Sequence, residues 1–139
     1  CLKNFIGCTH LKQRPYIVDS SRWEEIVAEF NAAYSPDINI VDGTVSMIEG
    51  GPWEGTPAET NIIIASGDRV AADITGLGVI KSFGKWAMVA SKDVWEQKQI
   101  KTALELGLGG GKDSIRLISG KGGAGFDGLL QRVRALTGL

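Results

Sequence analysis

The sequence has few residues of the types that hold metal clusters. It contains two cysteines, Cys1 and Cys8, and one histidine, His10. A ferredoxin-type iron–sulfur cluster needs four thiolates, and a structural zinc site usually has four Cys or His ligands. These residues are too few for either site. We therefore expect reduced thiols, although the spacing leaves a disulfide between them open.

Long apolar runs are also missing. No stretch reaches the roughly 18 residues that a membrane-spanning helix requires, and residues 1–8 lack the basic start and apolar core of a signal peptide. The sequence does not begin with methionine, which indicates processing, trimming or origin in a longer protein. We expect a soluble protein of the cytoplasm.

Neither sign of charge dominates the chain. With 15 Lys and Arg against 16 Asp and Glu, the net charge is -1, so no basic field predicts binding to nucleic acid. A chain of 139 residues suits one domain with a real core, because it buries roughly two-thirds of its unfolded surface. No internal repeat or linker divides it, and we expect a single domain over residues 1–139.

Four segments have the apolar spacing of amphipathic helices. Ser20 can cap the first of them, and Pro36 ends it. Asp68 is best interpreted as the cap of the second, because its carboxylate can accept bonds from the free amides of the first turn. The predicted helices span residues 20–33, 68–77, 94–106 and 126–136.

Short β-branched runs between these helices predict strands at residues 38–43, 61–65 and 114–118. Strands that alternate with helices usually pair in parallel and are joined by right-handed crossovers. The sequence therefore predicts an α/β fold, with a mostly parallel sheet and flanking helices.

A segment without periodicity, residues 44–60, separates the first two predicted strands. A structureless loop of this length in a compact domain is usually functional or disordered, and its large apolar side chains argue against disorder. Gly50 and Gly51 allow the backbone to approach a ligand closely. We expect this loop to direct Glu49 into a cleft beside Asp42, at the edge where open α/β sheets bind ligands.

Asp73 completes the predicted site. An acid among the apolar residues of the helix 68–77 pairs with a base, binds a cation or caps another loop. Together, Asp42, Glu49 and Asp73 would bind a hard cation such as magnesium through oxygen ligands. Alternatively, Asp42 and Glu49 would act as a carboxylate acid/base pair, with Lys3 holding an anionic group of the substrate.

The glycine-rich segment 120–126 precedes the last predicted helix, where free amides can hold an anion. It lacks the Gly-Lys-Ser/Thr ending of a nucleotide-triphosphate loop. A plain turn is the simpler interpretation.

Five segments match, in order and spacing, the motifs of one family. They are Lys3-Asn4-Phe5-Ile6-Gly7, Asp42-Gly43, Met47-Ile48-Glu49-Gly50-Gly51-Pro52, Gly67-Asp68-Arg69-Val70-Ala71-Ala72-Asp73 and Leu106-Gly107-Leu108-Gly109. This ordered set resembles the family known as domain of unknown function (DUF) 362. Each motif is weak alone, and the set is fairly specific.

The resemblance implies a wider context for the chain. Family members carry sequence before the Lys-Asn segment, so the chain resembles the C-terminal portion of a longer domain. Many members also carry ferredoxin-like iron–sulfur modules, which implies such a module, or the missing N-terminal half, as a partner. The alternative to a carboxylate site is therefore a non-catalytic partner domain of an iron–sulfur redox protein. Apolar surface exposed by a missing half would also favour a homodimer.

Overall fold

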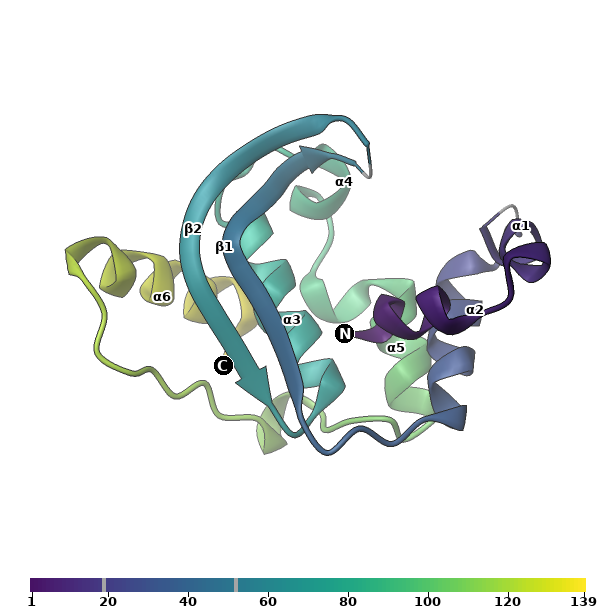
Figure 1. Cartoon of the computed structure of the whole chain (residues 1–139). Helices are drawn as coiled ribbons and strands as arrows, with labels where there is room; N and C mark the ends of the chain where they lie inside the picture. Colours follow the sequence, from purple (N-terminus) through teal and green to yellow (C-terminus); the bar gives the residue numbers. More distant parts are fainter. Residues whose placement is uncertain (19, 52) are drawn as a thin grey trace.

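The computed structural model describes residues 1–18, 20–51 and 53–139 and consists of a two-stranded sheet beside a layer of helices (Figure 1). The strands are β1 (Asn39–Gly50) and β2 (Gly55–Ser66). The α-helices are α1 (Arg14–Val18), α2 (Trp23–Phe30), α3 (Arg69–Lys81), α4 (Ala87–Ala90), α5 (Lys98–Glu105) and α6 (Ala124–Thr137). Short 3₁₀ helices are η1 (Leu2–Cys8), η2 (Leu11–Gln13), η3 (Asn31–Ala33), η4 (Val94–Glu96) and η5 (Lys112–Ser114).

The four predicted helices are all present. The first corresponds to α2 with η3, the second to α3, and the last to α6. The third is divided at Gln97 into η4 and α5. The Asp68 cap is confirmed, since its Oδ1 accepts from the amides of Val70 at 2.7 Å and Ala71 at 3.0 Å. Local apolar spacing and capping therefore placed the helices correctly.

The two strands form one long antiparallel hairpin, whose partners run from Asn39 with Ser66 to Gly50 with Gly55. The predicted mostly parallel sheet is therefore wrong. Only residues 51–54 separate the strands, and so short a connection permits antiparallel pairing alone, because parallel strands need a crossover of about a dozen residues or more.

The segment 44–60, predicted to be a loop, instead lengthens both strands. The register of the strands shifts between Gly43 and Val45 and again between Met47 and Glu49. Each shift of this kind breaks the two-residue period of a strand. This is why the sequence showed no strand periodicity here.

The third predicted strand, residues 114–118, is not a strand. η5 takes up its start, and residues 115–120 have no assigned element. This segment lies beside β2 around an apolar cavity of about 110 Å³, without a backbone hydrogen bond to β2 among the described residues. Leu117 packs against Val79, Leu129 and Val133, which holds the segment against α6 rather than in the sheet.

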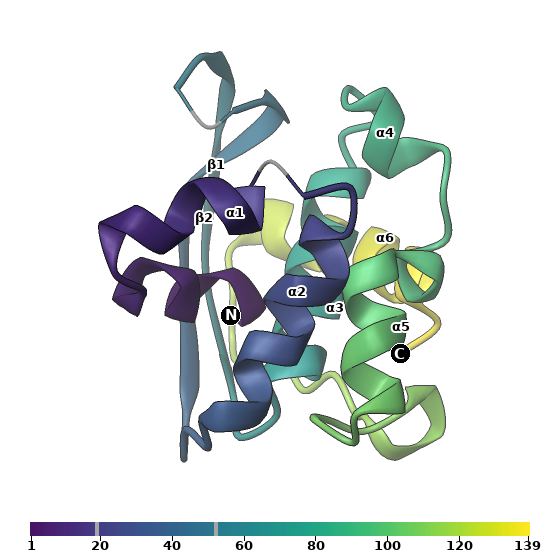
Figure 2. The same ribbon diagram turned by 90° about the vertical axis from the view of Figure 1, so that its right-hand side faces the viewer.

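The helices cover one face of the hairpin. α3 lies along it and contacts both strands, and on its other sides it contacts α5 and α6. Figure 2 shows the hairpin nearly edge-on, with α2, α3, α5 and α6 to one side of it. The main core lies between these helices and η1, and its fully buried side chains include Leu2, Val70, Ile74 and Ile100. The N-terminal segment is thus part of the core and reaches β1 and α3.

Candidate functional site

Asp42 lies on the outer face of β1 and is exposed. Its Oδ1 accepts two hydrogen bonds from Thr44, one from the amide at 2.9 Å and one from the hydroxyl at 2.8 Å. These two bonds hold the pKa of the Asp42 carboxyl below its ordinary value of 3.8. The carboxylate is therefore ionised at neutral pH, and among the described residues its second oxygen accepts no hydrogen bond.

Glu49 lies at the far end of the hairpin, next to the turn. It is exposed, and its Oε2 accepts a hydrogen bond of 3.3 Å from the Thr56 hydroxyl. Gly50 and Gly51 follow with φ values of 78° and 106°, which glycine adopts without strain, and Pro52 lies outside the described residues. The two glycines turn the chain here; they line none of the cavities near Asp42.

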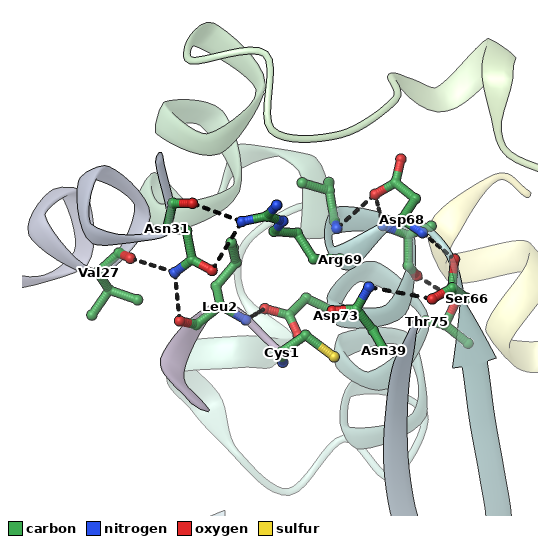
Figure 3. A network of polar contacts seen from close by, with 12 residues as sticks. Cys1, Leu2, Val27, Asn31, Asn39, Ser66, Asp68, Arg69, Asp73 and Thr75 are labelled. Atoms are coloured by element: carbon green, nitrogen blue, oxygen red, sulfur yellow. Dashed lines mark hydrogen bonds and ion pairs between the residues drawn. The ribbon is translucent and has the colours of Figure 1, made fainter. Parts of the chain in front are cut away.

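Asp73 projects from α3 toward the N-terminal segment (Figure 3). Its carboxylate accepts from two successive backbone nitrogens, that of Cys1 and that of Leu2 at 3.0 Å. The Asp73 side chain is only 11% exposed. Of the three roles expected for this acid, the structure shows the capping of another segment: it fixes the start of η1 against α3.

Two adjoining cavities lie where η1, β1 and α3 meet. The first, of about 350 Å³, is lined by Cys1, Asn4, Phe5, Pro36, Ile38, Asn39, Ile40, Val41 and Asp42. The second, of about 200 Å³, is lined by Cys1, Lys3, Val41, Ala72, Asp73, Gly76, Leu77, Ile80 and Gln99. Cys1 and Val41 line both, so the two cavities lie side by side, and we call them together the N-terminal cleft.

The N-terminal cleft brings together part of the predicted site. Lys3, Asp42 and Asp73 line it, and they come from three separate segments of the chain. Glu49 does not. In the part of the chain that the structure describes, no three His, Cys, Asp or Glu side chains lie close enough to hold a metal ion together. A cation in this cleft would therefore need ligands of another kind.

Several cleft residues were not predicted. Asn4, Asn39 and Gln99 supply its side-chain amides, and Cys1, considered before only as a thiol, lines both cavities. Asn39 is buried, and its Nδ2 donates to the Ser66 carbonyl at 3.2 Å. Of these residues, Asn39 alone gave a signal in the sequence, because it is a polar residue at an inward position of a predicted strand.

A polar network behind the cleft holds these segments in place (Figure 3). Arg69, on α3, is buried and donates to the carbonyls of Asn31 and Tyr34, each at 2.7 Å. Asn31 in turn donates from Nδ2 to the Leu2 carbonyl at 2.7 Å. α3 is therefore tied to η1 through Asp73 and to the end of α2 through Arg69.

Asp68 links α3 to the glycine-rich segment after α5. While Oδ1 caps the helix, Oδ2 accepts from the Gly110 amide. The approach is close, since a Cβ on Gly109 would lie 2.5 Å from Asp68 Oδ1. The segment Leu106–Gly109 therefore leads into a contact with Asp68 where only small residues fit.

Replacing Asp68 with alanine is expected to lower the free energy of unfolding by about 2 kcal/mol, because the helix loses its cap and the Gly110 amide loses its acceptor. Urea denaturation measures this change. Asp93→Ala is the matched control: Asp93 caps only the three-residue η4, through the Trp95 amide, and should cost less. Equal losses in the two variants would contradict the bridging role.

The fold and the cleft define a helical domain with a projecting hairpin, in which the N-terminal segment, β1 and α3 border a cleft lined by Lys3, Asp42 and Asp73. Residues 1–78 of this chain match the family described as Domain of unknown function (DUF362). The matched part is more than half of the chain, and the chain belongs to this family. It contains η1, the hairpin and most of α3, but not Leu106–Gly109.

Among curated proteins, the chain is similar to the thylakoid-associated protein sll1697 of Synechocystis sp. The two are 32% identical over 77 residues, which are 52% of this chain and 24% of that protein. The match thus spans about a quarter of the length of its relative. No solved structure matches the chain. Among the described residues, no helix has both the length and the apolarity to cross a membrane.

Proposed function

We propose that the N-terminal cleft binds a small anionic ligand together with a divalent cation. The observation that supports this proposal is the convergence of Lys3, Asp42 and Asp73 on two cavities that share Cys1 and Val41. The converging groups include a lysine for an anion and an open carboxylate for a cation. The substrate and the reaction are left unassigned.

The cation would bind on the Asp42 side of the cleft. Asp42 has an ionised carboxylate with one oxygen free of Thr44, and the amide of Asn4 lines the same cavity. Both groups offer the hard oxygen ligands that magnesium prefers. Asp73 is less suited, because its carboxylate already accepts two backbone hydrogen bonds.

A single open carboxylate supplies few ligands to a cation. We therefore favour a cation that is already bound to an anionic ligand, because the anion supplies further ligands. Magnesium commonly keeps several waters and binds through one or two protein carboxylates plus phosphate oxygens of the substrate. Lys3 lies exposed on the adjoining cavity, with its Nζ 4.9 Å from the centre of the Trp23 ring. From there its charge would attract the anionic part of the complex.

The test is a calorimetric titration with manganese and inorganic pyrophosphate added together. Asp42→Asn is expected to weaken binding at least tenfold, since it removes the charged ligand while keeping the shape of the side chain. Glu49→Gln is the matched control, because Glu49 lies at the hairpin turn and outside the cleft. Wild-type protein that binds neither ion would contradict the proposal, as would equal loss in both variants.

The alternative is a non-catalytic partner domain of an iron–sulfur redox protein. One observation favours it: the matched region makes up only 24% of the relative sll1697, so that protein carries the region within a much longer chain. Cys1 and Cys8 are free thiols. A four-cysteine motif elsewhere in the gene that encodes this chain would support this alternative, and a gene without one would contradict it.

A further inference from the structure

The outer face of the hairpin, which points away from the helices, carries exposed aliphatic side chains. Ile38, Ile40, Val45 and Ile63 are each exposed by 61% to 64%. Cross-strand pairing places Ile40 opposite Ala65 and Asp42 opposite Ile63, so that these side chains share one face. Contiguous apolar surface of this kind usually marks an interaction site.

The accessible surface of the whole chain is larger than its mass predicts. A compact monomer of 14.8 kDa exposes about 7,000 Å², whereas this chain exposes 8549 Å². The excess of about 1,500 Å² is larger than the roughly 800 Å² that each partner buries in an interface of standard size. The chain thus leaves more of its surface uncovered than a compact monomer of the same mass.

The charge of the hairpin indicates the chemistry of a partner. The hairpin, residues 39–66, contains four acidic residues, Asp42, Glu49, Glu54 and Glu59, and no Lys or Arg. Asp42 and Glu59 are both exposed, and strand pairing places them opposite Ile63 and Val45. Two copies of this face would repel one another, and so would an anionic lipid surface, whereas basic groups would be attracted.

We propose that the outer face of the hairpin is a docking surface for a protein partner that presents aliphatic side chains between lysines or arginines. The aliphatic side chains of the partner would cover Ile40 and Ile63, and its cations would face Asp42 and Glu59. An extended basic segment suits this surface best, since strand-like segments alternate their side chains with the same period as the hairpin. Ile40 and Asp42 also line the N-terminal cleft, so a partner on this face would compete with a cation for Asp42, and the variants below are made at other residues.

The experiment uses three labelled synthetic peptides, which alternate lysine with valine, glutamate with valine, and lysine with serine. Fluorescence anisotropy should show that the wild-type chain binds the lysine peptide at least tenfold more tightly than the glutamate peptide. Ile63→Asp and Glu59→Lys should each weaken this binding at least fivefold. Neither residue lines the N-terminal cleft. If the cleft binds manganese and pyrophosphate, both variants should therefore bind them like the wild type.

Leu11→Asp is the matched control, because Leu11 is 71% exposed but lies on η2, away from the hairpin. It should bind the lysine peptide like the wild type, and circular dichroism should show that all three variants are folded. A lysine–serine peptide that binds as tightly as the lysine–valine peptide would overturn the role of the aliphatic side chains. A wild-type dimer in analytical ultracentrifugation that Ile63→Asp dissociates would overturn the basic partner in favour of a second copy.

Discussion

Replacing Ile74 with alanine is expected to lower the free energy of unfolding by about 2 to 5 kcal/mol, the range for removing a large aliphatic side chain from a packed core. Ile74 is fully buried at 0% exposure, in the cluster that joins α3 to η1, α2 and α5. The missing atoms would leave a cavity that these helices cannot close without moving. Urea denaturation followed by tryptophan fluorescence measures the change.

The control is the same substitution at Ile63, which is 63% exposed on the hairpin. Its loss should be well under 1 kcal/mol in the isolated chain, because the side chain is mostly in water before and after unfolding. If Ile63→Ala cost as much as Ile74→Ala, the outer face of the hairpin would be buried in solution. That result would contradict the arrangement of helices on one face alone.

Arg69→Ala is expected to lower the free energy of unfolding by about 3 kcal/mol. The guanidinium is the donor to the carbonyls of Asn31 and Tyr34, and alanine would leave both without it. A buried acceptor that loses its donor costs about 1 to 3 kcal/mol. The same denaturation experiment measures the change. If the slope of the free energy of unfolding against urea concentration is unchanged, the substitution has altered stability alone.

Arg69→Lys tests whether geometry or charge is responsible. An ammonium group keeps the charge, but it cannot reproduce the planar fork that reaches two carbonyls at once. We therefore expect an intermediate loss. If the lysine variant were as stable as the wild type, the charge near the end of α2 would be sufficient, and the two hydrogen bonds would not explain the stability.

The helices could be predicted because their signals are local. Asp68 stands two and three residues from the amides that it caps, and apolar spacing shows the inner face of each helix. The hairpin could not be predicted in the same way. Its alternation is interrupted at Gly43 and Met47. In addition, the sequence of one segment does not show with which distant segment it pairs.

The sequence predicted only part of the candidate site, because the site too depends on contacts between distant segments. Lys3, Asp42 and Asp73 do line one cleft, although they are far apart in the sequence. Glu49 was expected beside Asp42 on the assumption that residues 44–60 fold back as a loop. Since these residues instead continue β1 outward, the strand carries Glu49 away from Asp42. The amides of Asn4 and Gln99 gave no signal, because amide side chains are common on any surface.

The double use of Asp68 has a consequence for how the molecule opens. One oxygen caps α3 and the other holds Gly110, 42 positions away in the sequence. The segment after α5 therefore cannot swing out without exposing the first turn of α3 as well. Because α3 also holds η1 through Asp73 and the segment after α2 through Arg69, the helical layer should unfold as a single cooperative unit.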